Sequence, residues 1–475
     1  MSLNQNLQEK YPHLELSVLK LSEVKKDNES FRIDSEFFKK EYFNAIKTMQ
    51  LNKIEYLGNN VKLNSRYSQP KYDEMSNIKV INSQYIRNEY IDYENAKYGY
   101  GKIVPKEAIL INSTGVGTLG RVFINMLDFN FSIDSHINVI LVKDEIYLNP
   151  YFLTIFLQSY YGQIQVTRYY SGTSGQIEIY SKDFSYFKIP ILPMSFQQEI
   201  EKMVKDSHKA LEESKALYKK AEETLYLELG LDPLDPLKSI ETKNQKNLNI
   251  SIRSLKESFL KTGRLDSEYY QEKYEEIEFY IKNYSGGYCR LGDIGIFNNG
   301  SFISESLYTT EARRAYIRIK ELSFDAPIKT QECIFIDDNF IATNETIVKK
   351  GDFIIAIIGN TIGKVNLIPQ ELEGSFISNN TTRFRLFHKV NLEFMELLLR
   401  SVFVQEQMQR EFTQTAQPKI SNQSLKNILI PKIDFKIQEK ISKYIEESFS
   451  LRKKSKELLD NAKIKVEQEI ENLRN

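Results

Sequence analysis

The sequence has few of the residues that build metal centres or disulfide frameworks. Its 475 residues include two cysteines, four histidines and no tryptophan. The two cysteines are far apart in the sequence, so neither a disulfide framework nor a thiolate zinc site is expected. The longest apolar run, Phe353–Ile358, is much shorter than the roughly 20 residues that cross a bilayer. We therefore expect a cytoplasmic protein without a membrane partner.

The chain also lacks an excess of charge of either sign. Lys and Arg number 64, Asp and Glu number 64, and the formal net charge is zero. This balance argues against a polycation that coats nucleic acid, although it permits local basic loops. With 41% hydrophobic residues, a chain of this length is expected to form two or more globular units.

An internal duplication organises the whole sequence. The segment Arg32–Phe38 (RIDSEFF) recurs in similar form 232 residues later, at Arg264–Tyr270 (RLDSEYY). A glycine turn at Gly117–Val122 is answered by Asn360–Val365, 243 residues later. An Ile-Pro step and a Gln-x-x-Ile motif then recur 241 residues apart in the same order. Several blocks in one order, with a slowly drifting offset, indicate a tandem duplication.

Each copy shows the same succession of local patterns. Short apolar runs typical of strands come first, followed by a helical segment, the Ile-Pro step and a long stretch typical of one helix. The fold class is therefore α/β (mixed α+β), with globular units predicted at 1–195 and 251–435. Long helices are predicted at 196–230 and 436–475, and the Pro-rich stretch 231–250 is a linker.

Both predicted helices carry apolar residues three or four positions apart. This spacing favours a narrow seam that pairs with another helix. The alternative is that each helix packs only on its own globular unit, but two copies of the seam in one chain favour pairing. The predicted seam residues are Ile200, Val204, Leu211, Tyr218, Ala221 and Leu225 in the first helix, and Ile441, Ile445, Leu459, Ala462 and Val466 in the second.

The order and the duplication of these motifs resemble the specificity subunit of type I restriction-modification systems, from about Phe31 to Asn475. The resemblance implies two target-recognition domains, each reading one half of a bipartite and asymmetric double-stranded DNA target. It also implies an antiparallel coiled-coil spacer and pseudo-two-fold symmetry. The implied protein partners are two methyltransferase subunits and, through them, restriction subunits. One departure from the repeat is Asn360, which stands where the first copy has Gly117.

No catalytic loop accompanies the duplication. An adenine methyltransferase needs an (Asp/Asn/Ser)-Pro-Pro-(Tyr/Phe) loop and a glycine-rich site for its methyl donor, whereas Asn149-Pro150-Tyr151 has one proline and is typical of a helix start. Gly115–Gly120 fits GxGxxG, but its second copy does not, so we interpret it as a turn. We expect a non-catalytic subunit without cofactors. The resemblance assigns the methyl donor, Mg²⁺ and ATP to partner subunits.

The polar residues beside the glycine turns, and those in a later segment of each copy, are candidates for DNA contact. Arg and Lys suit guanine edges or phosphates, and Asn and Gln suit adenine. The candidates are Asn112, Ser113, Thr114, Arg121, Thr173, Ser174, Gln176, Asn360, Lys364, Gln414, Gln417 and Lys419. The alternative is that such residues only satisfy turns.

Three functional alternatives to the specificity subunit remain open from the sequence. One is a free-standing modification enzyme or nuclease, which the missing catalytic loops disfavour. Another is a duplicated scaffold that binds protein rather than DNA. The third is the specificity subunit of a related, type II-like modification system. The recognised bases and the length of the spacer cannot be deduced from the sequence.

Overall fold

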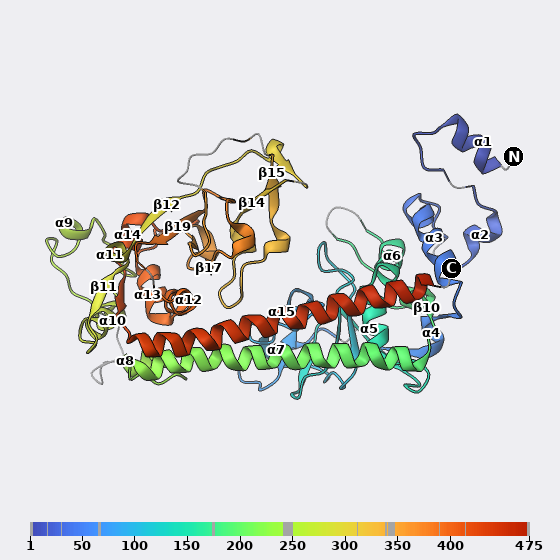
Figure 1. Cartoon of the computed structure of the whole chain (residues 1–475). Helices are drawn as coiled ribbons and strands as arrows, with labels where there is room; N and C mark the ends of the chain where they lie inside the picture. Colours follow the sequence, from blue (N-terminus) through green and yellow to red (C-terminus); the bar gives the residue numbers. More distant parts are fainter. Residues whose placement is uncertain are drawn as a thin grey trace. The chain divides into compact units, whose positions relative to one another are not determined.

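The computed structural model divides the chain into two compact units (Figure 1). Unit 1 comprises Met1–Glu212 with Arg452–Asn475, and unit 2 comprises Glu213–Leu451. The described residues are 3–16, 18–29, 31–64, 68–172, 176–240, 250–310, 312–337, 340, 347–388, 390–413 and 415–472. None of the helices in these ranges is both long and apolar enough to cross a bilayer.

Unit 1 is built on two four-stranded sheets, with strand orders β2-β9-β6-β7 and β3-β5-β4-β8, and on the two-stranded pair β1-β10. Its elements are α1 (Leu3–Lys10), α2 (Leu21–Lys25), α3 (Lys40–Met49), β1 (Ile54–Tyr56), α4 (Leu57–Asn60), β2 (Val61–Asn64), β3 (Lys71–Tyr72), β4 (Lys79–Ile81), β5 (Lys97–Tyr100), β6 (Ile109–Asn112), β7 (Val122–Ile124), β8 (Phe131–Ile133), β9 (Ile137–Val142), α5 (Pro150–Gln158), α6 (Tyr160–Tyr169) and β10 (Lys188–Pro190).

Unit 2 repeats this topology, with strand orders β12-β19-β16-β17 and β13-β15-β14-β18 and the pair β11-β20. Its elements are α8 (Pro236–Ile240), α9 (Phe259–Thr262), α10 (Glu272–Lys282), β11 (Tyr288–Arg290), α11 (Leu291–Ile294), β12 (Gly295–Asn299), β13 (Tyr308–Thr309), β14 (Arg314–Ile317), β15 (Ile334–Ile336), β16 (Phe353–Ala356), β17 (Val365–Leu367), β18 (Phe376–Ile377), β19 (Thr381–Leu386), α12 (Leu392–Arg400), α13 (Val402–Arg410), α14 (Asn422–Asn427) and β20 (Leu429–Pro431).

The central strand of each larger sheet lies between two apolar clusters, with alternate residues in each: Ile109 and Ile111 face one and Leu110 the other in unit 1, and Phe353 and Ile355 face one and Ile354 the other in unit 2. All four residues of β6 and all four of β16 are buried, because each strand lies inside its sheet and is covered on both faces. Such strands read as continuous apolar runs rather than alternating ones. The mixed α+β fold class and the two tandem sheet-rich units predicted from the sequence are confirmed.

Two long helices extend through both units: α7 (Met194–Glu228) and α15 (Phe435–Glu471). The glutamine of the repeated Gln-x-x-Ile motif lies near the start of each helix and makes the same hydrogen bond in both. The side-chain amide of Gln197 donates to the carbonyl of Leu192 at 2.8 Å, and that of Gln438 donates to the carbonyl of Ile433 at 2.9 Å. The repeated glutamine therefore ties the start of each helix to the short segment that connects the helix to the strand before it.

The two helices contact each other through pairs of buried serines. In unit 1 the hydroxyl of Ser207 donates to the carbonyl oxygen of Ser455 at 2.8 Å. In unit 2 the hydroxyl of Ser448 donates to the carbonyl oxygen of Ser214, also at 2.8 Å. A step of seven residues forward on α7 is therefore a step of seven residues back on α15, and the helices are antiparallel.

All eleven predicted seam residues are buried. Ile200, Val204, Leu459, Ala462 and Val466 also belong to the large core of unit 1, and the members on the other halves of the helices, Leu211 excepted, belong to the core of unit 2. Pairing of the two helices and packing of each helix on a globular unit are thus compatible, because residues of both helices belong to the same core as the globular unit. The serines were not predicted as seam residues, because the seam was inferred from the spacing of apolar side chains and serine is polar.

Candidate nucleic-acid interface

A glycine turn follows the central strand β6 of unit 1. Gly115, Gly117 and Gly120 have φ angles of +93°, +79° and +77°, a region that side chains with a Cβ rarely adopt. At Gly120 a Cβ would lie 2.9 Å from the side chains of both Gln163 and Val166. The turn is therefore a tight loop at the end of β6, as the sequence predicted.

The segment after α6 lies beside this turn. Glu178 forms isolated β-bridges with both Thr114 and Ser171. The amide of Gly115 donates to the carbonyl of Ile177 at 3.0 Å. The fold thus brings together the turn and the later polar segment, which are separated by about fifty residues in the sequence.

Unit 2 builds the same arrangement from the second copy. Ile358 forms an isolated bridge with Lys419, and the amide of Gly359 donates to the carbonyl of Pro418 at 2.9 Å. Gly359 and Gly363 have φ angles of +75° and +91°. The turn therefore forms without a glycine at Asn360.

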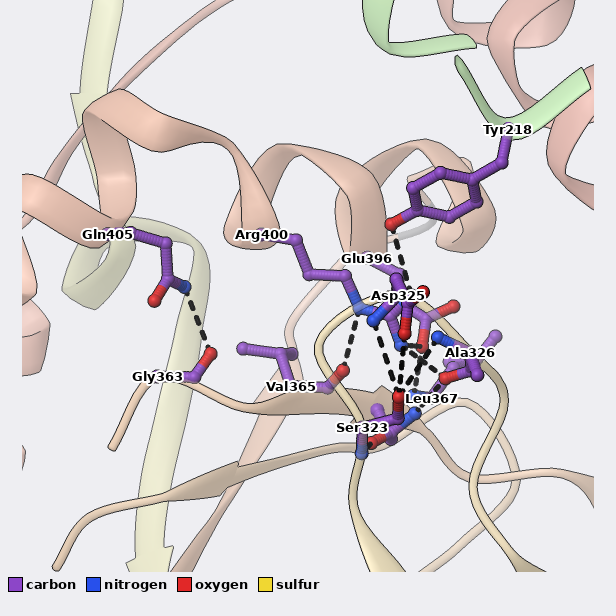
Figure 2. A network of polar contacts seen from close by, with 11 residues as sticks. Tyr218, Ser323, Asp325, Ala326, Gly363, Val365, Leu367, Glu396, Arg400 and Gln405 are labelled. Carbon is purple, nitrogen blue, oxygen red and sulfur yellow. Dashed lines mark hydrogen bonds and ion pairs between the residues drawn. The ribbon is translucent and has the colours of Figure 1, made fainter. Parts of the chain in front are cut away.

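A glutamine on the neighbouring helix fastens each turn. The side-chain amide of Gln163 on α6 donates to the carbonyl of Gly120 at 2.9 Å. That of Gln405 on α13 donates to the carbonyl of Gly363 at 3.0 Å (Figure 2). This pair of positioning residues was not predicted from the sequence, although the two glutamines stand at equivalent places in the two copies.

The repeated Arg-x-Asp motif holds the other side of the same surface. The guanidinium of Arg32 pairs with Asp34 at 2.8 Å and donates to the carbonyl of Tyr170 at 2.7 Å. In unit 2, Arg264 pairs with Asp266 and donates to the carbonyl of Phe412 at 2.9 Å. These hydrogen bonds from the arginines also lower the pKa of both aspartates.

Tyr170 and Phe412 immediately precede the two polar segments of the candidate surface. The Arg-x-Asp motif, which revealed the duplication, thus hydrogen-bonds the backbone at the point where the chain enters this surface. It was not among the predicted site residues.

Four of the predicted DNA-contacting residues are exposed on this surface, and three others are half-buried near it. Gln176 is exposed in unit 1, and Asn360, Gln417 and Lys419 are exposed in unit 2. Burial lowers the pKa of the half-buried Lys364 and Arg121, and Thr114 is also half-buried. Thr173, Ser174 and Gln414 lie outside the described residues.

Asn112 and Ser113 are fully buried. The amide group of Asn112 donates to the carbonyl of Ser83, and the hydroxyl of Ser113 donates to the carbonyl of His136, both at 2.8 Å. A direct base contact would require these side chains to give up both bonds and leave the interior. Their position in this structure is therefore that of turn supports, which was the alternative reading of such residues.

A buried polar network lies behind the turn of unit 2 (Figure 2). Arg400 and Glu396 on α12 form an ion pair at 2.6 Å, with both side chains no more than 4% exposed. Arg400 also donates to the carbonyls of Val365 and Ala326 and to the hydroxyl of Tyr218 on α7. The pKa of nearby Glu222 is raised to about 7 by burial and by the Asp325 carboxylate.

The candidate side chains of this interface are hydrogen-bond donors, acceptors and cations, the groups that contact base edges and phosphates in DNA complexes. Within the described ranges, no group of three or more His, Cys, Asp or Glu side chains is placed to hold a metal ion.

Comparison with known proteins gives consistent matches over most of the chain. The S subunit of a type I restriction-modification system from M. genitalium is 14% identical, with a TM-score of 0.42, and the match covers 89% of this chain and 95% of that chain. The HsdS subunit from Thermoanaerobacter tengcongensis is also 14% identical, with a TM-score of 0.28, and the match covers 88% and 96%. No curated protein sequence matches significantly.

A family model described as the type I restriction modification DNA specificity domain matches the chain twice, at residues 35–223 and 287–461. The two matches fall on the two copies of the duplication and together span more than half of the sequence. The chain therefore belongs to the family of type I restriction-modification DNA specificity domains.

Proposed function

We propose that this chain is the specificity subunit of a type I restriction-modification complex, in which each unit reads one half of a bipartite double-stranded DNA target. The observation that carries the proposal is that one chain builds the same candidate surface twice, from a glycine turn and a polar segment. Because the repeated motif fixes the backbone of both surfaces, their exposed side chains are free to differ.

The two surfaces present different side chains to a partner, which supports an asymmetric target. At equivalent places of the repeat, Glu178 of unit 1 is half-buried, whereas Lys419 of unit 2 is exposed. In the glycine turns, unit 1 exposes Val116 and unit 2 exposes Asn360. An apolar side chain, an amide and an ammonium group prefer different base edges. We therefore expect the two half-sites to differ in sequence.

We propose that the chain docks two methyltransferase subunits and, through them, restriction subunits, and that these partners supply the methyl donor, Mg²⁺, ATP and catalysis. Support comes from aliphatic side chains exposed at equivalent places in both copies. Ile33 and Leu265, which occupy the same place in the repeated Arg-x-Asp block, are 80% and 69% exposed. Repeated surfaces of this kind suit one partner bound twice.

The stoichiometry can be read from the mass of the assembled complex. Native mass spectrometry of the chain purified with its methyltransferase subunit should give two methyltransferase subunits per chain. The chain alone should transfer no methyl group to DNA. A complex that saturates at one methyltransferase subunit would contradict the proposal of two equivalent docking positions.

The bipartite reading is tested by exchanging one unit. Replacing residues 31–195 with the matching region of a relative of different specificity should change one half of the target and retain the other, since each surface is assembled within its own unit. The measurement is the sequence of methylated sites produced by the complex with methyltransferase subunits. The reciprocal exchange in unit 2 is the matched control. Loss of both half-sites in a folded chimera would count against independent reading, and absence of any DNA preference in the parent complex would favour a protein-binding scaffold.

A further inference from the structure

One face of the sheet β3-β5-β4-β8 in unit 1 gathers tyrosines and lysines on its first three strands. Lys71 on β3 lies opposite Tyr100 on β5, and Lys79 on β4 lies opposite Tyr98 on β5. Directly opposite residues in a ladder project to the same side, as do alternate residues of one strand. Lys71, Lys79, Tyr98 and Tyr100 therefore share one side of the sheet, which we call the ribbon face.

The ribbon face is exposed to solvent, and hydrogen bonds hold the ammonium group of Lys79 in place. Tyr98 and Tyr100 are 42% and 50% exposed, and Lys71 is exposed without an ion pair to any residue that the structure describes. The ammonium of Lys79 donates to the carbonyls of Tyr93 and Glu94 at 3.1 and 2.7 Å, and it lies 5.2 Å from the ring centroid of Tyr98. Lys79 is thus fixed beside an exposed ring, and Lys71 remains available.

Unit 2 has no such face at the equivalent place. Ile81 pairs with Ile133 in the same parallel register as Ile317 with Ile377, so Lys79 corresponds to Ala315 and Tyr98 to its cross-strand neighbour Phe335. Ala315 is 2% exposed, and Phe335 packs against the same apolar cluster. The second copy uses these positions for its core, so the repeated fold does not require lysine and tyrosine there.

The chemistry of the ribbon face matches a phosphate backbone better than an apolar protein surface. The exposed ammonium of Lys71 and the hydroxyls of two exposed phenols are donors, and phosphate oxygens are the acceptors that such groups contact in DNA complexes. The exposed side chains of the ribbon face are Lys71, Tyr98 and Tyr100, whereas Ile81 on the same side of β4 is buried in an apolar cluster and is not offered to a partner.

We infer that the ribbon face binds phosphates of the duplex beside the half-site read by unit 1, independently of base sequence. The inference rests on the DNA-reading function proposed above. It assigns to unit 1 a share of salt-dependent affinity that unit 2 does not have at this position, with Lys71 as a phosphate contact and Tyr98 and Tyr100 as hydroxyl donors.

The test uses the complex with methyltransferase subunits and labelled duplexes that carry either the target or a random sequence. Lys71→Gln should weaken binding to both duplexes by the same factor, about three- to tenfold, and should reduce the slope of log affinity against log salt by about one. The double variant Tyr98→Phe and Tyr100→Phe should weaken both without changing the slope. Lys47→Gln on α3, also exposed, is the matched control and should behave as the parent.

The outcomes separate this inference from the proposed function. Parent complex that prefers no duplex would overturn the function itself. If the parent complex binds its target but Lys71→Gln has the same affinity and salt slope as Lys47→Gln, the ribbon-face inference alone is overturned. Lower retention of methyltransferase in Lys71→Gln, with an unchanged salt slope, would assign the face to a protein contact and would also overturn it.

Discussion

Replacement of Arg400 by methionine is expected to lower the free energy of unfolding of unit 2 by about 3–5 kcal/mol, the usual cost of removing one partner from a buried ion pair. The substitution leaves the Glu396 carboxylate inside the unit without its cation. It also removes the donor to the carbonyls of Val365 and Ala326, which lie in different segments of the unit.

The loss should become smaller as the pH falls. Burial raises the pKa of Glu396 even in the presence of Arg400, and removing the cation raises it further. A protonated Glu396 is neutral and no longer needs the guanidinium. We therefore expect Arg400→Met to be less destabilising near pH 5 than near pH 8.

Unit 1 supplies the control for this prediction. Its helix α5 has Thr154 and Gln158 where α12 has Glu396 and Arg400. The double variant Glu396→Thr with Arg400→Gln should cost less than Arg400→Met alone, because no charge remains unpaired. Hydrogen exchange of α12 and α5 peptides measures both units in one sample. Exchange of α12 in Arg400→Met at the parent rate would contradict the prediction.

Insertion of seven residues into both long helices is expected to weaken binding to the original target by at least about tenfold and to lengthen the preferred unread spacer. Helices α7 and α15 each continue from one unit into the other. Seven residues add about 10 Å of helix, roughly three base pairs of duplex. Selection from duplexes with randomised spacer length, bound by the complex with methyltransferase subunits, measures the change.

The serine contacts determine where the insertions belong. Ser207 faces Ser455 and Ser214 faces Ser448, so the matched sites are after Leu211 and after Ser450. Seven residues reproduce the serine-to-serine spacing and keep the seam in register. The same insertion in α7 alone is the control and should disrupt pairing. A folded double-insertion variant that still prefers the original spacing would show that the helices do not set it.

Much of the architecture could be predicted because it depends on local and repeated signals. The apolar run at Phe353–Ile358 predicted a buried strand, and β16 occupies Phe353–Ala356. The stretches without glycine or proline predicted the two long helices within a few residues of their observed ends. Such elements are visible in a sequence because their periodicity is that of one face or one core.

The candidate interface was predicted only as regions. Asn112 and Asn360 have the same residue type and were both candidates, yet Asn112, at the end of β6, is buried and Asn360, within the turn of unit 2, is exposed. The side-chain amide of Asn112 is bonded to the carbonyl of Ser83, which comes from a distant segment. Residue type states what a side chain can bind but not which partner the fold brings to it.

By itself, the sequence determined the duplication, the mixed α+β units, the long helices and the family resemblance, because these depend on order, spacing and composition. Only the tertiary structure decided that the Arg-x-Asp motif fastens the candidate surface, that serines lie between the helices, and that a lysine-tyrosine face is open in unit 1 but replaced by core in unit 2. Each of these depends on contacts between segments far apart in the chain, which local patterns do not encode.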